Sequence, residues 1–325
     1  MKKHFKKLLL MALMAVMAVG LIACGTDKSD NESTKEEKTS VTITSLDASK
    51  NEIELEVPYN PKRIAILDLA SLDIIDELGV GDRVVGMAST SIDYLEKYSN
   101  DASIKNLGTI KEADLEAVME CEPDIIFIGG RLSKSYDALS EIAPVVYLAT
   151  DTNEGLVNSV SKNAKTIASI FGMEDKVDSL MSDFGARIDT IKKISSGKRA
   201  LVGMTTSGSF NLLGNDGRCS LIGVEAGFNN LTAAGSTSTH GNESSFETVV
   251  QQNPDYIFVM DRDSAISTAG AKTAKEIVEN ELVKTTDAYK NNHIIYLEHS
   301  NVWYTAEGGI QALDIMLTDL EKGLK

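Results

Sequence analysis

The chain contains one short sequence motif twice, and each copy ends in an arginine. Residues 115–131 and residues 246–262 each hold a short amphipathic segment, a Pro-Asp pair, an apolar run and a final arginine, Arg131 or Arg262. Such an apolar run is typical of a buried strand, and open α/β sheets bind ligands beyond the carboxyl ends of their strands. Because guanidinium groups are permanently charged donors to anions, the repeat predicts two related lobes with an anion-binding cleft between them. The alternative is that the lobes share a strand signature and both arginines are solvated.

Other unusual side chains fall in segments that the sequence predicts to be loops. Arg218 follows an Asn-Asp-Gly turn, His240 lies in a long polar loop, and Trp303 and Tyr304 follow a strand. Trp303 is the single tryptophan of the chain, and loops of this kind seldom bury large rings. Each residue has an ordinary alternative: an ion pair between Arg218 and Asp216, a solvated histidine, a tryptophan that caps the core, or a tyrosine at the edge of the core. None of these residues alone supports a site.

The elements that would position these side chains alternate between strand and helix. Residues 40–172 begin with an alternating strand pair at 41–57 and continue as βα units, which are typical of parallel sheets. Residues 173–196 carry one apolar stripe and predict an unbroken helix of roughly 30 Å. The alternation restarts over residues 197–325. We therefore expect an α/β fold of two Rossmann-like lobes, here called the first lobe (40–172) and the second lobe (197–325), joined by one long helix, with the ligand cleft between the lobes. The alternative is that the helix packs on the surface of one lobe.

The composition excludes several classes of function. The 325 residues carry a formal net charge of −16, which argues against nucleic acid as a partner, because phosphate binding needs a basic face. Apolar residues make up 42% of the chain, so each lobe can bury a core. Cys121 and Cys219 fall in different lobes, and we interpret them as free, partly buried thiols. No cluster of cysteine and histidine has the spacing of a structural zinc site.

The amino-terminal residues are typical of a bacterial lipoprotein. Residues 2–7 contain four lysines, and the apolar segment at 8–20 is too short to cross a bilayer comfortably. Leu-Ile-Ala precedes Cys24, so we expect a signal peptide over residues 1–23 and a lipid on Cys24. The alternative is an ordinary secretory signal with a chance cysteine. Residues 24–39 are polar and predict a flexible leash, and no later apolar run is long enough to span a bilayer.

These features together resemble a known family. The lipoprotein signal, the leash, the repeated Pro-Asp strand and the long helix resemble the periplasmic-type binding proteins that serve iron-siderophore and cobalamin ABC transporters. The segments at 239–241, 254–262 and 303–304 most resemble the catecholate members, which bind enterobactin-type and petrobactin-type ligands. The resemblance covers about residues 40–325 and implies a class III binding-protein fold. It also implies a monomeric receptor, lipid-anchored on the outside of a Gram-positive cell, that passes a ferric siderophore to an ABC permease and its ATPase.

The resemblance assigns roles to the unusual residues. Three arginines line the cleft of the catecholate members, and by motif position they correspond to Arg131, Arg218 and Arg262. His240 and Tyr304 match a histidine and a tyrosine that complete the coordination of Fe(III) when the ligand supplies only two catechols. A phenolate oxygen suits this hard cation, imidazole is an acceptable further ligand, and a bound cation favours the ionised phenol.

Three more side chains receive roles from the same resemblance. We expect Trp303 to stack on a catechol ring. Asp73 and Glu225 match the acidic positions, one on each lobe, through which the family docks on its permease. The chain departs from the pattern of the family at Glu243, which places a carboxylate near the anion site. This carboxylate either points outward or orients His240 through a hydrogen bond.

Two alternative functions remain. The same fold could carry haem, cobalamin or a hydroxamate siderophore: His240 and Tyr304 could ligate haem iron, whereas three arginines argue against a neutral hydroxamate complex. A surface hydrolase would use a serine of the Ser207-Gly208-Ser209 segment as nucleophile and His240 as base. The chain has no Gly-x-Ser-x-Gly elbow, and nothing singles out a third, orienting carboxylate. We therefore expect no catalysis and no intrinsic cofactor.

Overall fold

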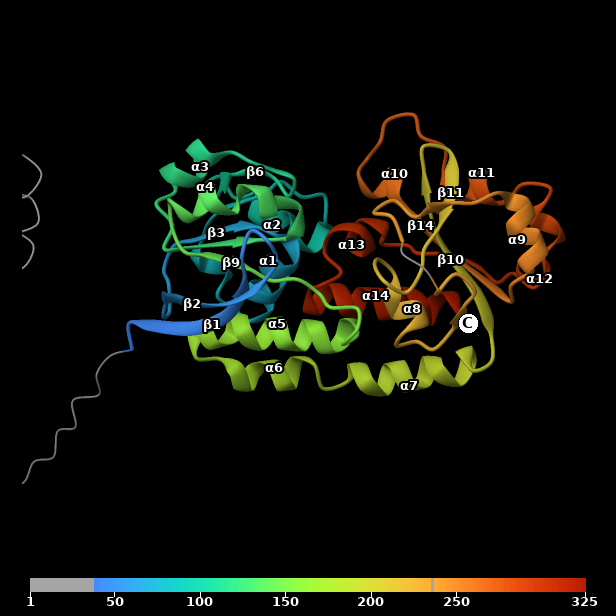
Figure 1. Ribbon diagram of the computed structural model, residues 1–325, viewed down its shortest axis with the longest axis horizontal. Helices are drawn as coiled ribbons and strands as arrows, with labels where there is room; N and C mark the ends of the chain where they lie inside the picture. Colours follow the sequence, from blue (N-terminus) through green and yellow to red (C-terminus); the bar gives the residue numbers. More distant parts are fainter. Residues whose placement is uncertain (1–37, 235–236) are drawn as a thin grey trace, which may run out of the picture. The chain divides into compact units, whose positions relative to one another are not determined.

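The computed structural model describes residues 38–234 and 237–325, and Figure 1 shows their helices and strands. The expected signal peptide, Cys24 and the expected leash before residue 38 lie outside the described residues. Within the described ranges, no helix combines the length and the apolar character that crossing a bilayer requires.

The first lobe is built on a parallel sheet with an antiparallel hairpin beside it. Its elements are β1 (Ser40–Leu46), β2 (Glu52–Pro58), β3 (Ile64–Leu67), α1 (Leu69–Glu77), η1 (Gly81–Arg83), β4 (Val84–Met87), η2 (Asp93–Leu95), α2 (Glu96–Ser99), β5 (Lys105–Asn106), β6 (Gly108–Thr109), β7 (Glu112–Ala113), α3 (Leu115–Glu120), β8 (Ile125–Ile128), η3 (Gly130–Ser135), α4 (Tyr136–Ser140), β9 (Val145–Tyr147) and α5 (Leu156–Phe171). The sheet has the order β5-β4-β3-β8-β9 with parallel neighbours. The strand pair predicted at 41–57 is confirmed as the hairpin β1–β2.

The second lobe is built on a mixed sheet. Its elements are β10 (Arg199–Thr206), β11 (Ser209–Leu212), α8 (Ser220–Gly223), β12 (Asn229–Asn230), β13 (Asn242–Glu243), α9 (Phe246–Gln252), β14 (Tyr256–Asp261), α10 (Arg262–Ala265), α11 (Ala274–Val278), η4 (Val283–Thr285), α12 (Asp287–Lys290), β15 (Ile294–Tyr296), α13 (Ser300–Thr305) and α14 (Ile310–Gly323). The order is β13-β11-β10-β14-β15, and β12 also pairs with β10. Strands β10, β14 and β15 run parallel, whereas β11 returns antiparallel to β10 through a turn at Ser207 and Gly208.

In each lobe, the aspartate of the repeated Pro-Asp pair hydrogen-bonds to the backbone at the start of a neighbouring central strand. The carboxylate of Asp124 accepts hydrogen bonds from the backbone N–H groups of residues 62 and 63 at 2.7 and 2.9 Å, just before β3. The carboxylate of Asp255 accepts one from the N–H of Arg199, the first residue of β10, at 2.8 Å. Each aspartate thus fixes the start of β8 or β14 against the start of the neighbouring central strand. The carboxyl ends of both pairs of strands are aligned as a consequence.

The single helix predicted over residues 173–196 is two helices. Helix α6 (Glu174–Leu180) ends with Met181 as its C-cap, and α7 (Phe184–Ser195) begins three residues after that cap. Helix α6 packs on α5, whereas α7 packs on α14, so the apolar stripe of this segment faces two different partners. The hydroxyl of Ser182 donates to the carbonyl of Ser179 at 2.9 Å, a side-chain bond of the kind that competes with helical pairing.

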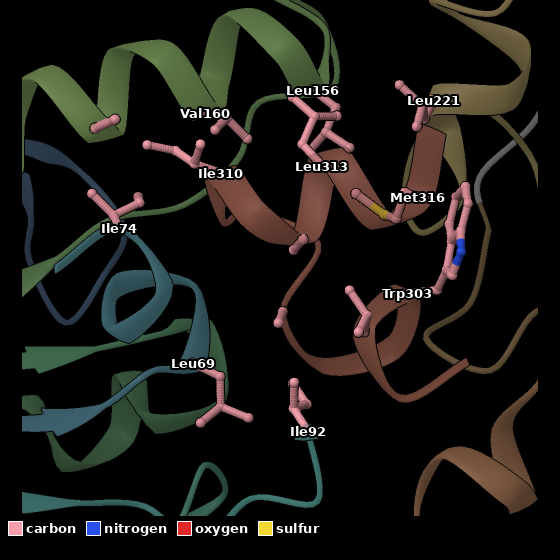
Figure 2. Packing of buried hydrophobic residues seen from close by; sticks show 14 of the residues in the cluster. Leu69, Ile74, Ile92, Leu156, Val160, Leu221, Trp303, Ile310, Leu313 and Met316 are labelled. Carbon is pink, nitrogen blue, oxygen red and sulfur yellow. The ribbon is translucent and has the colours of Figure 1, made fainter. Parts of the chain in front are cut away.

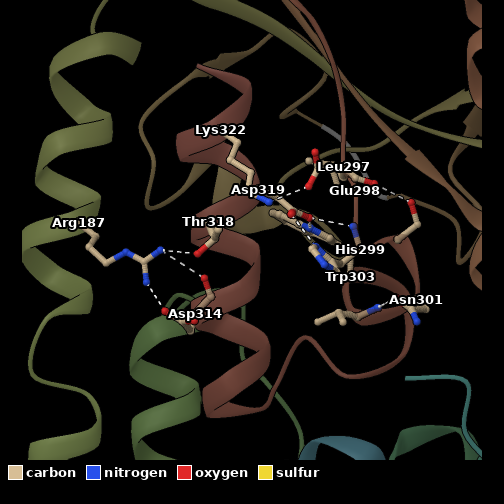
Figure 3. A network of polar contacts seen from close by, with 12 residues as sticks. Arg187, Leu297, Glu298, His299, Asn301, Trp303, Asp314, Thr318, Asp319 and Lys322 are labelled. Carbon is tan, nitrogen blue, oxygen red and sulfur yellow. Dashed lines mark hydrogen bonds and ion pairs between the residues drawn. The ribbon is translucent and has the colours of Figure 1, made fainter. Parts of the chain in front are cut away.

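Helix α7 is held on α14 by one arginine. The guanidinium of Arg187 contacts the carboxylate of Asp314 at 2.5 Å, that of Glu321 at 2.7 Å and the hydroxyl of Thr318 at 2.9 Å. Figure 3 shows this side chain reaching across from α7 to α14. The segment between the lobes thus contacts α5 through α6 and the last helix of the chain through α7.

Helix α14 connects the two lobes. It packs against α1 and α5 of the first lobe and against α13 and β15 of the second lobe. One hydrophobic cluster contains side chains from both lobes, and Figure 2 shows Leu313 and Met316 of α14 among Leu156, Leu221 and Trp303. Residues 38–325 accordingly form one unit, and the expected lobe boundaries at 172 and 197 stay predictions.

Candidate ligand-binding site

Three arginines surround Tyr304. The phenol oxygen of Tyr304 accepts a hydrogen bond from Nε of Arg262 at 3.3 Å. Its backbone carbonyl accepts from Nη2 of Arg131 at 3.1 Å and from Nε of Arg218 at 3.4 Å. The guanidinium carbons of Arg131, Arg218 and Arg262 lie 5.3, 4.5 and 5.7 Å from the centroid of the Tyr304 ring, within the range of cation–π attraction. The arginines singled out in the sequence therefore converge on one side chain.

The convergence follows from the topology. Arg131 lies in η3, directly after β8, and Arg262 is the first residue of α10, directly after β14. Both therefore leave the carboxyl ends of central strands, as the repeat predicted, and they come from different lobes. Arg218 precedes α8 and is held by the carbonyl of Thr239, which accepts from its Nη1 at 2.9 Å.

The positive charges of the cluster are incompletely neutralised. Arg262 pairs with Asp263 at 3.1 Å, whereas Arg131 and Arg218 form no ion pair with a carboxylate in the part of the chain that the structure describes. Burial, and then the charge of Arg218, lower the pKa of Arg131. A bound anion would offset both the cost of burying the charge of Arg131 and its repulsion by Arg218, so this cluster is suited to an anionic ligand.

The phenol of Tyr304 is prepared for ionisation. The side chain is buried, and burial alone would raise its pKa. The hydrogen bond from Arg262 and the charges of Arg218, Arg262 and Arg131 outweigh burial and place the pKa of Tyr304 below its ordinary value. A phenol of this kind loses its proton more readily to a metal cation than an ordinary tyrosine does.

A cavity of about 320 Å³ lies beside this cluster. Its lining includes Arg131, Arg218 and Tyr304, together with the carboxyls of Asp68 and Glu307. Burial raises the pKa of both carboxyls above its ordinary value; hydrogen bonds from Ser71 oppose this effect at Asp68, and the charge of Arg218 opposes it at Glu307. Sequence reasoning missed these two acids, although Asp68 follows a buried strand at its carboxyl end, which is the signal that identified Arg131.

His240 lies at the edge of this arrangement. Its side chain is exposed, its backbone carbonyl accepts from Nδ2 of Asn211 at 2.8 Å, and its neighbour Thr239 lines the cavity. Slight desolvation at this largely exposed side chain, and then the charges of Arg262 and Arg218, lower the pKa of His240, which favours the neutral imidazole that a metal requires. Its role as an iron ligand stays a prediction.

Glu243, the departure from the family pattern, is exposed in β13, where its backbone pairs with Asn211 of β11.

The prediction that Trp303 stacks on the ligand is wrong. Trp303 is fully buried, and its indole Nε1 donates to Oδ2 of Asp319 at 2.9 Å (Figure 3). The prediction failed because residues 300–305 form helix α13 and not a loop. Consecutive residues of a helix point about 100° apart, so Trp303 enters the core when Tyr304 faces the arginines.

The prediction that Asp73 is a surface docking acid is also wrong. Asp73 is fully buried, and its carboxylate accepts from the backbone N–H groups of Gln311 and Ala312 at 3.0 and 2.9 Å and from the hydroxyl of Tyr94 at 2.6 Å. Asp73 therefore caps the amino end of α14. Burial raises its pKa to about 6, while these hydrogen bonds lower it.

Glu225 of the second lobe likewise caps a helix of the first lobe. Its Oε1 accepts from the backbone N–H of Val157, in the first turn of α5, at 3.1 Å, and its Oε2 is buried. The side chain of Glu225 is half-buried, and its role in docking on the permease stays a prediction. Each lobe thus supplies one carboxylate that caps a helix packed between the lobes.

One group of possible metal ligands lies outside the cavity. Glu298, His299 and Asp319 place ligand atoms within 4.8 Å of one another. Asp319 already accepts hydrogen bonds from Trp303 and His299, and Glu298 pairs with Lys322 at 2.9 Å. These groups satisfy one another as a structural network. Cys121 and Cys219 are both free, as expected, and they are fully rather than partly buried.

Comparison with known proteins supports the assignment of the fold. Residues 64–300 match the periplasmic binding protein family. The chain is also 36% identical over 330 residues to the petrobactin-binding protein YclQ of Bacillus subtilis, a match that covers 98% of this chain and 99% of YclQ. The chain belongs to the periplasmic binding protein family.

Solved structures agree with this result. The crystal structure of YclQ superposes with a TM-score of 0.81 at 36% identity and covers 88% of this chain and 99% of its own. The catecholate-siderophore binding protein VctP of Vibrio cholerae superposes with a TM-score of 0.78 at 30% identity, covering 87% and 100%. The ferric-anguibactin-binding protein FatB of Vibrio anguillarum is 26% identical over 273 residues, covering 82% and 84%. The expected class III α/β fold and the expected family are confirmed.

Membership of this family also decides between binding and catalysis. The family and its similar members are substrate-binding proteins for transport, so the chain is a binding protein and the hydrolase alternative is wrong. Ser207 is a turn residue between β10 and β11. The descriptions of similar proteins name ferric siderophores as ligands and no intrinsic cofactor, and other relatives in Bacillus subtilis are described as substrate-binding lipoproteins of ABC transporters.

Proposed function

We propose that the protein captures a ferric catecholate siderophore and delivers it to an ABC importer for iron uptake. The observation that carries this proposal is the convergence of Arg131, Arg218 and Arg262 on Tyr304 beside a cavity. A ferric catecholate carries excess negative charge on oxygen atoms, and guanidinium groups bind such oxygens through charge-assisted hydrogen bonds.

Tyr304 and His240 give the site a second property. Fe(III) is a hard cation that prefers oxygen ligands and accepts imidazole. The lowered pKa values of both side chains favour the phenolate and the neutral imidazole, which are the forms that bind a metal. A siderophore with two catechols leaves two of six iron positions open, and these two residues would fill them.

The cargo distinguishes this proposal from the alternatives on the same fold. A ferric hydroxamate is neutral and would gain little from three guanidinium groups. Three of the more similar relatives are named for petrobactin, anguibactin and a catecholate siderophore, which supports a catecholate over haem or cobalamin.

The location and the partners follow from the rest of the chain. In the proposed protein, residues 1–23 are removed, Cys24 carries the lipid, and residues 24–39 tether a monomeric fold to the outer face of the cell membrane. The loaded form then docks on a permease and its ATPase. Because Asp73 is buried within the fold, another acidic residue of the first lobe would make that contact, together with Glu225 of the second lobe.

A binding panel tests the proposal. Protein that lacks residues 1–24 would be titrated with a ferric tris-catecholate, a ferric bis-catecholate, a ferric hydroxamate and haem, with visible absorbance as the signal. We expect saturable binding of both catecholates and none of the others. Binding of haem or hydroxamate alone would refute the proposed cargo. The Tyr304→Phe variant should bind the bis-catecholate without the spectral shift that phenolate coordination produces.

A further inference from the structure

A second cavity adjoins the cavity at the arginines. It has a volume of about 300 Å³ and lies between the hairpin β1–β2 and helix α5. Five residues line both cavities and mark the boundary between them: Lys50, Leu148, Ala149, Thr150 and Asn163. Nothing in the function described so far uses this second space.

The residue at the junction is held by a rigid turn. Lys50 lies in the turn between β1 and β2, where the carboxylate of Asp47 accepts from the backbone N–H groups of Ser49 and Asn51 at 2.8 and 2.9 Å. The N–H of Lys50 donates to the carbonyl of Asp47 at 2.9 Å. Lys50 has a φ of 67°, a left-handed conformation that disfavours a lysine by about 1–2 kcal/mol. The turn thus holds a long cationic side chain where glycine or asparagine would fit with less strain.

The ammonium group of Lys50 is available to a ligand. Lys162, which also lines the second cavity, is paired with Glu52 and Glu154 at 3.7 Å each. Lys50, in contrast, forms no ion pair with a carboxylate of the described residues. Lys50 lines both cavities, so it lies at the passage from the first cavity, which Arg131 and Arg218 also line, to the second.

The walls of the second cavity are polar and ordered. Nδ2 of Asn163 donates to the carbonyl of Ala149 at 3.1 Å, which fixes the partition between the cavities. The hydroxyl of Ser159 donates to the carbonyl of Asp151 at 3.0 Å. Both signs of charge are present in the lining, so the space suits a neutral or mixed polar chain with hydrogen-bonding groups rather than a second iron complex.

We propose that the second cavity is an accessory subsite that binds the iron-free linker of the siderophore, with Lys50 contacting the ligand at the junction. This inference rests on the proposed function. It specifies the ligand class as a linear catecholate siderophore whose polar linker, carrying amides or amines, extends away from the iron. A cyclic scaffold keeps its linker compact against the iron and cannot reach the second cavity.

Two ligands and two matched variants test the subsite. The ligands are a ferric complex of unlinked dihydroxybenzoate and a ferric complex of a linear bis-catechol with an amide-containing linker. Thr166 lines the second cavity but not the first, so Thr166→Tyr should fill its far end. Ser161 lies on the same helix and lines neither cavity, and Ser161→Tyr is the control.

We expect Thr166→Tyr and Lys50→Ala each to weaken the linear ligand by about tenfold, equivalent to the loss of one good polar contact. The unlinked complex should bind the wild-type protein and Thr166→Tyr equally. Equal affinities of Thr166→Tyr and Ser161→Tyr for the linear ligand would overturn the subsite. If the unlinked complex still binds in that case and Arg131→Ala weakens it, the proposed function stands while the subsite fails. If neither complex binds the wild-type protein, both are refuted.

Discussion

Arg262 donates a hydrogen bond to the phenol oxygen of Tyr304 at 3.3 Å, and these two residues come from helices that follow different strands of the same sheet. The contact is the strongest single influence that lowers the pKa of Tyr304 against the effect of burial. It therefore links the arginine cluster directly to the chemistry that the tyrosine can perform.

This link predicts the acidity of Tyr304. Removing the charge in Arg262→Gln should raise the pKa of Tyr304, because burial is then opposed by two arginines instead of three. An ultraviolet difference titration against Tyr304→Phe isolates this phenol from the other tyrosines. Arg262→Lys keeps the charge and should preserve part of the effect. An unchanged pKa in Arg262→Gln would show that the hydrogen bond has no influence on ionisation.

The arginines should also control affinity and its dependence on salt. Arg131→Ala and Arg218→Ala should each weaken a ferric catecholate by about 10- to 100-fold, because a hydrogen bond to a charged group contributes about 1.5–3 kcal/mol. Both variants should show a shallower dependence of affinity on ionic strength, since screening acts on fewer charge pairs. Lys193→Ala removes an exposed charge from α7 and is the control. Equal losses in Lys193→Ala would mean that net charge, and not the cluster, sets the affinity.

Substitutions of Trp303 and Tyr304 should have different effects, the first on stability and the second on ligand binding. Trp303→Phe removes the indole donor to buried Asp319 and should lower the free energy of unfolding by about 1–3 kcal/mol, with affinity for the siderophore nearly unchanged. Tyr304→Phe keeps the ring packed and should show the reverse: little change in stability and weaker binding of a ferric bis-catecholate. Chemical denaturation and titration of both variants measure the two effects. A large loss of affinity in Trp303→Phe would contradict the structural role of the indole.

The cap on α14 should make stability depend on pH. Because the pKa of Asp73 is raised from its ordinary 3.8 to about 6, the folded state prefers the protonated carboxyl. The corresponding stabilisation is complete below about pH 4 and disappears as the pH rises through 6, a change of about 3 kcal/mol. In Asp73→Asn this component is absent. The difference in unfolding free energy between wild type and Asp73→Asn should therefore fall between pH 4 and pH 7, and a constant difference would refute the shifted pKa.

The parts of the site that the sequence predicts well are those that local pattern and topology determine together. A Pro-Asp pair followed by an apolar run identifies a central strand, and the residue after such a strand lies at the ligand-binding edge of the sheet. Arg131 and Arg262 were found in this way. The same rule applied to the strand before Asp68 would have added that carboxyl to the cavity.

Other features depend on contacts between distant segments. Residues 300–305 contain β-branched and aromatic side chains with modest helix propensity, so the helix that they form is decided by packing against α14 and α10. Asp73 and Glu225 have the pattern of acids on a helix, and only the placement of α14 and α5 shows that they are caps. The break between α6 and α7 likewise reflects two packing partners, which one apolar stripe does not distinguish.

The central claim is that the cleft recognises the negative charge of a ferric catecholate. A free catechol is largely protonated near neutral pH, whereas bound Fe(III) removes its protons and creates the anion. The most direct measurement is therefore the affinity of the wild-type protein for one siderophore with and without iron. The arginine cluster predicts that the ferric complex binds at least about 100-fold more tightly, or by about 3 kcal/mol. Equal affinity for the iron-free siderophore would contradict this account, because the anion that the arginines are placed to bind would then have no part in recognition.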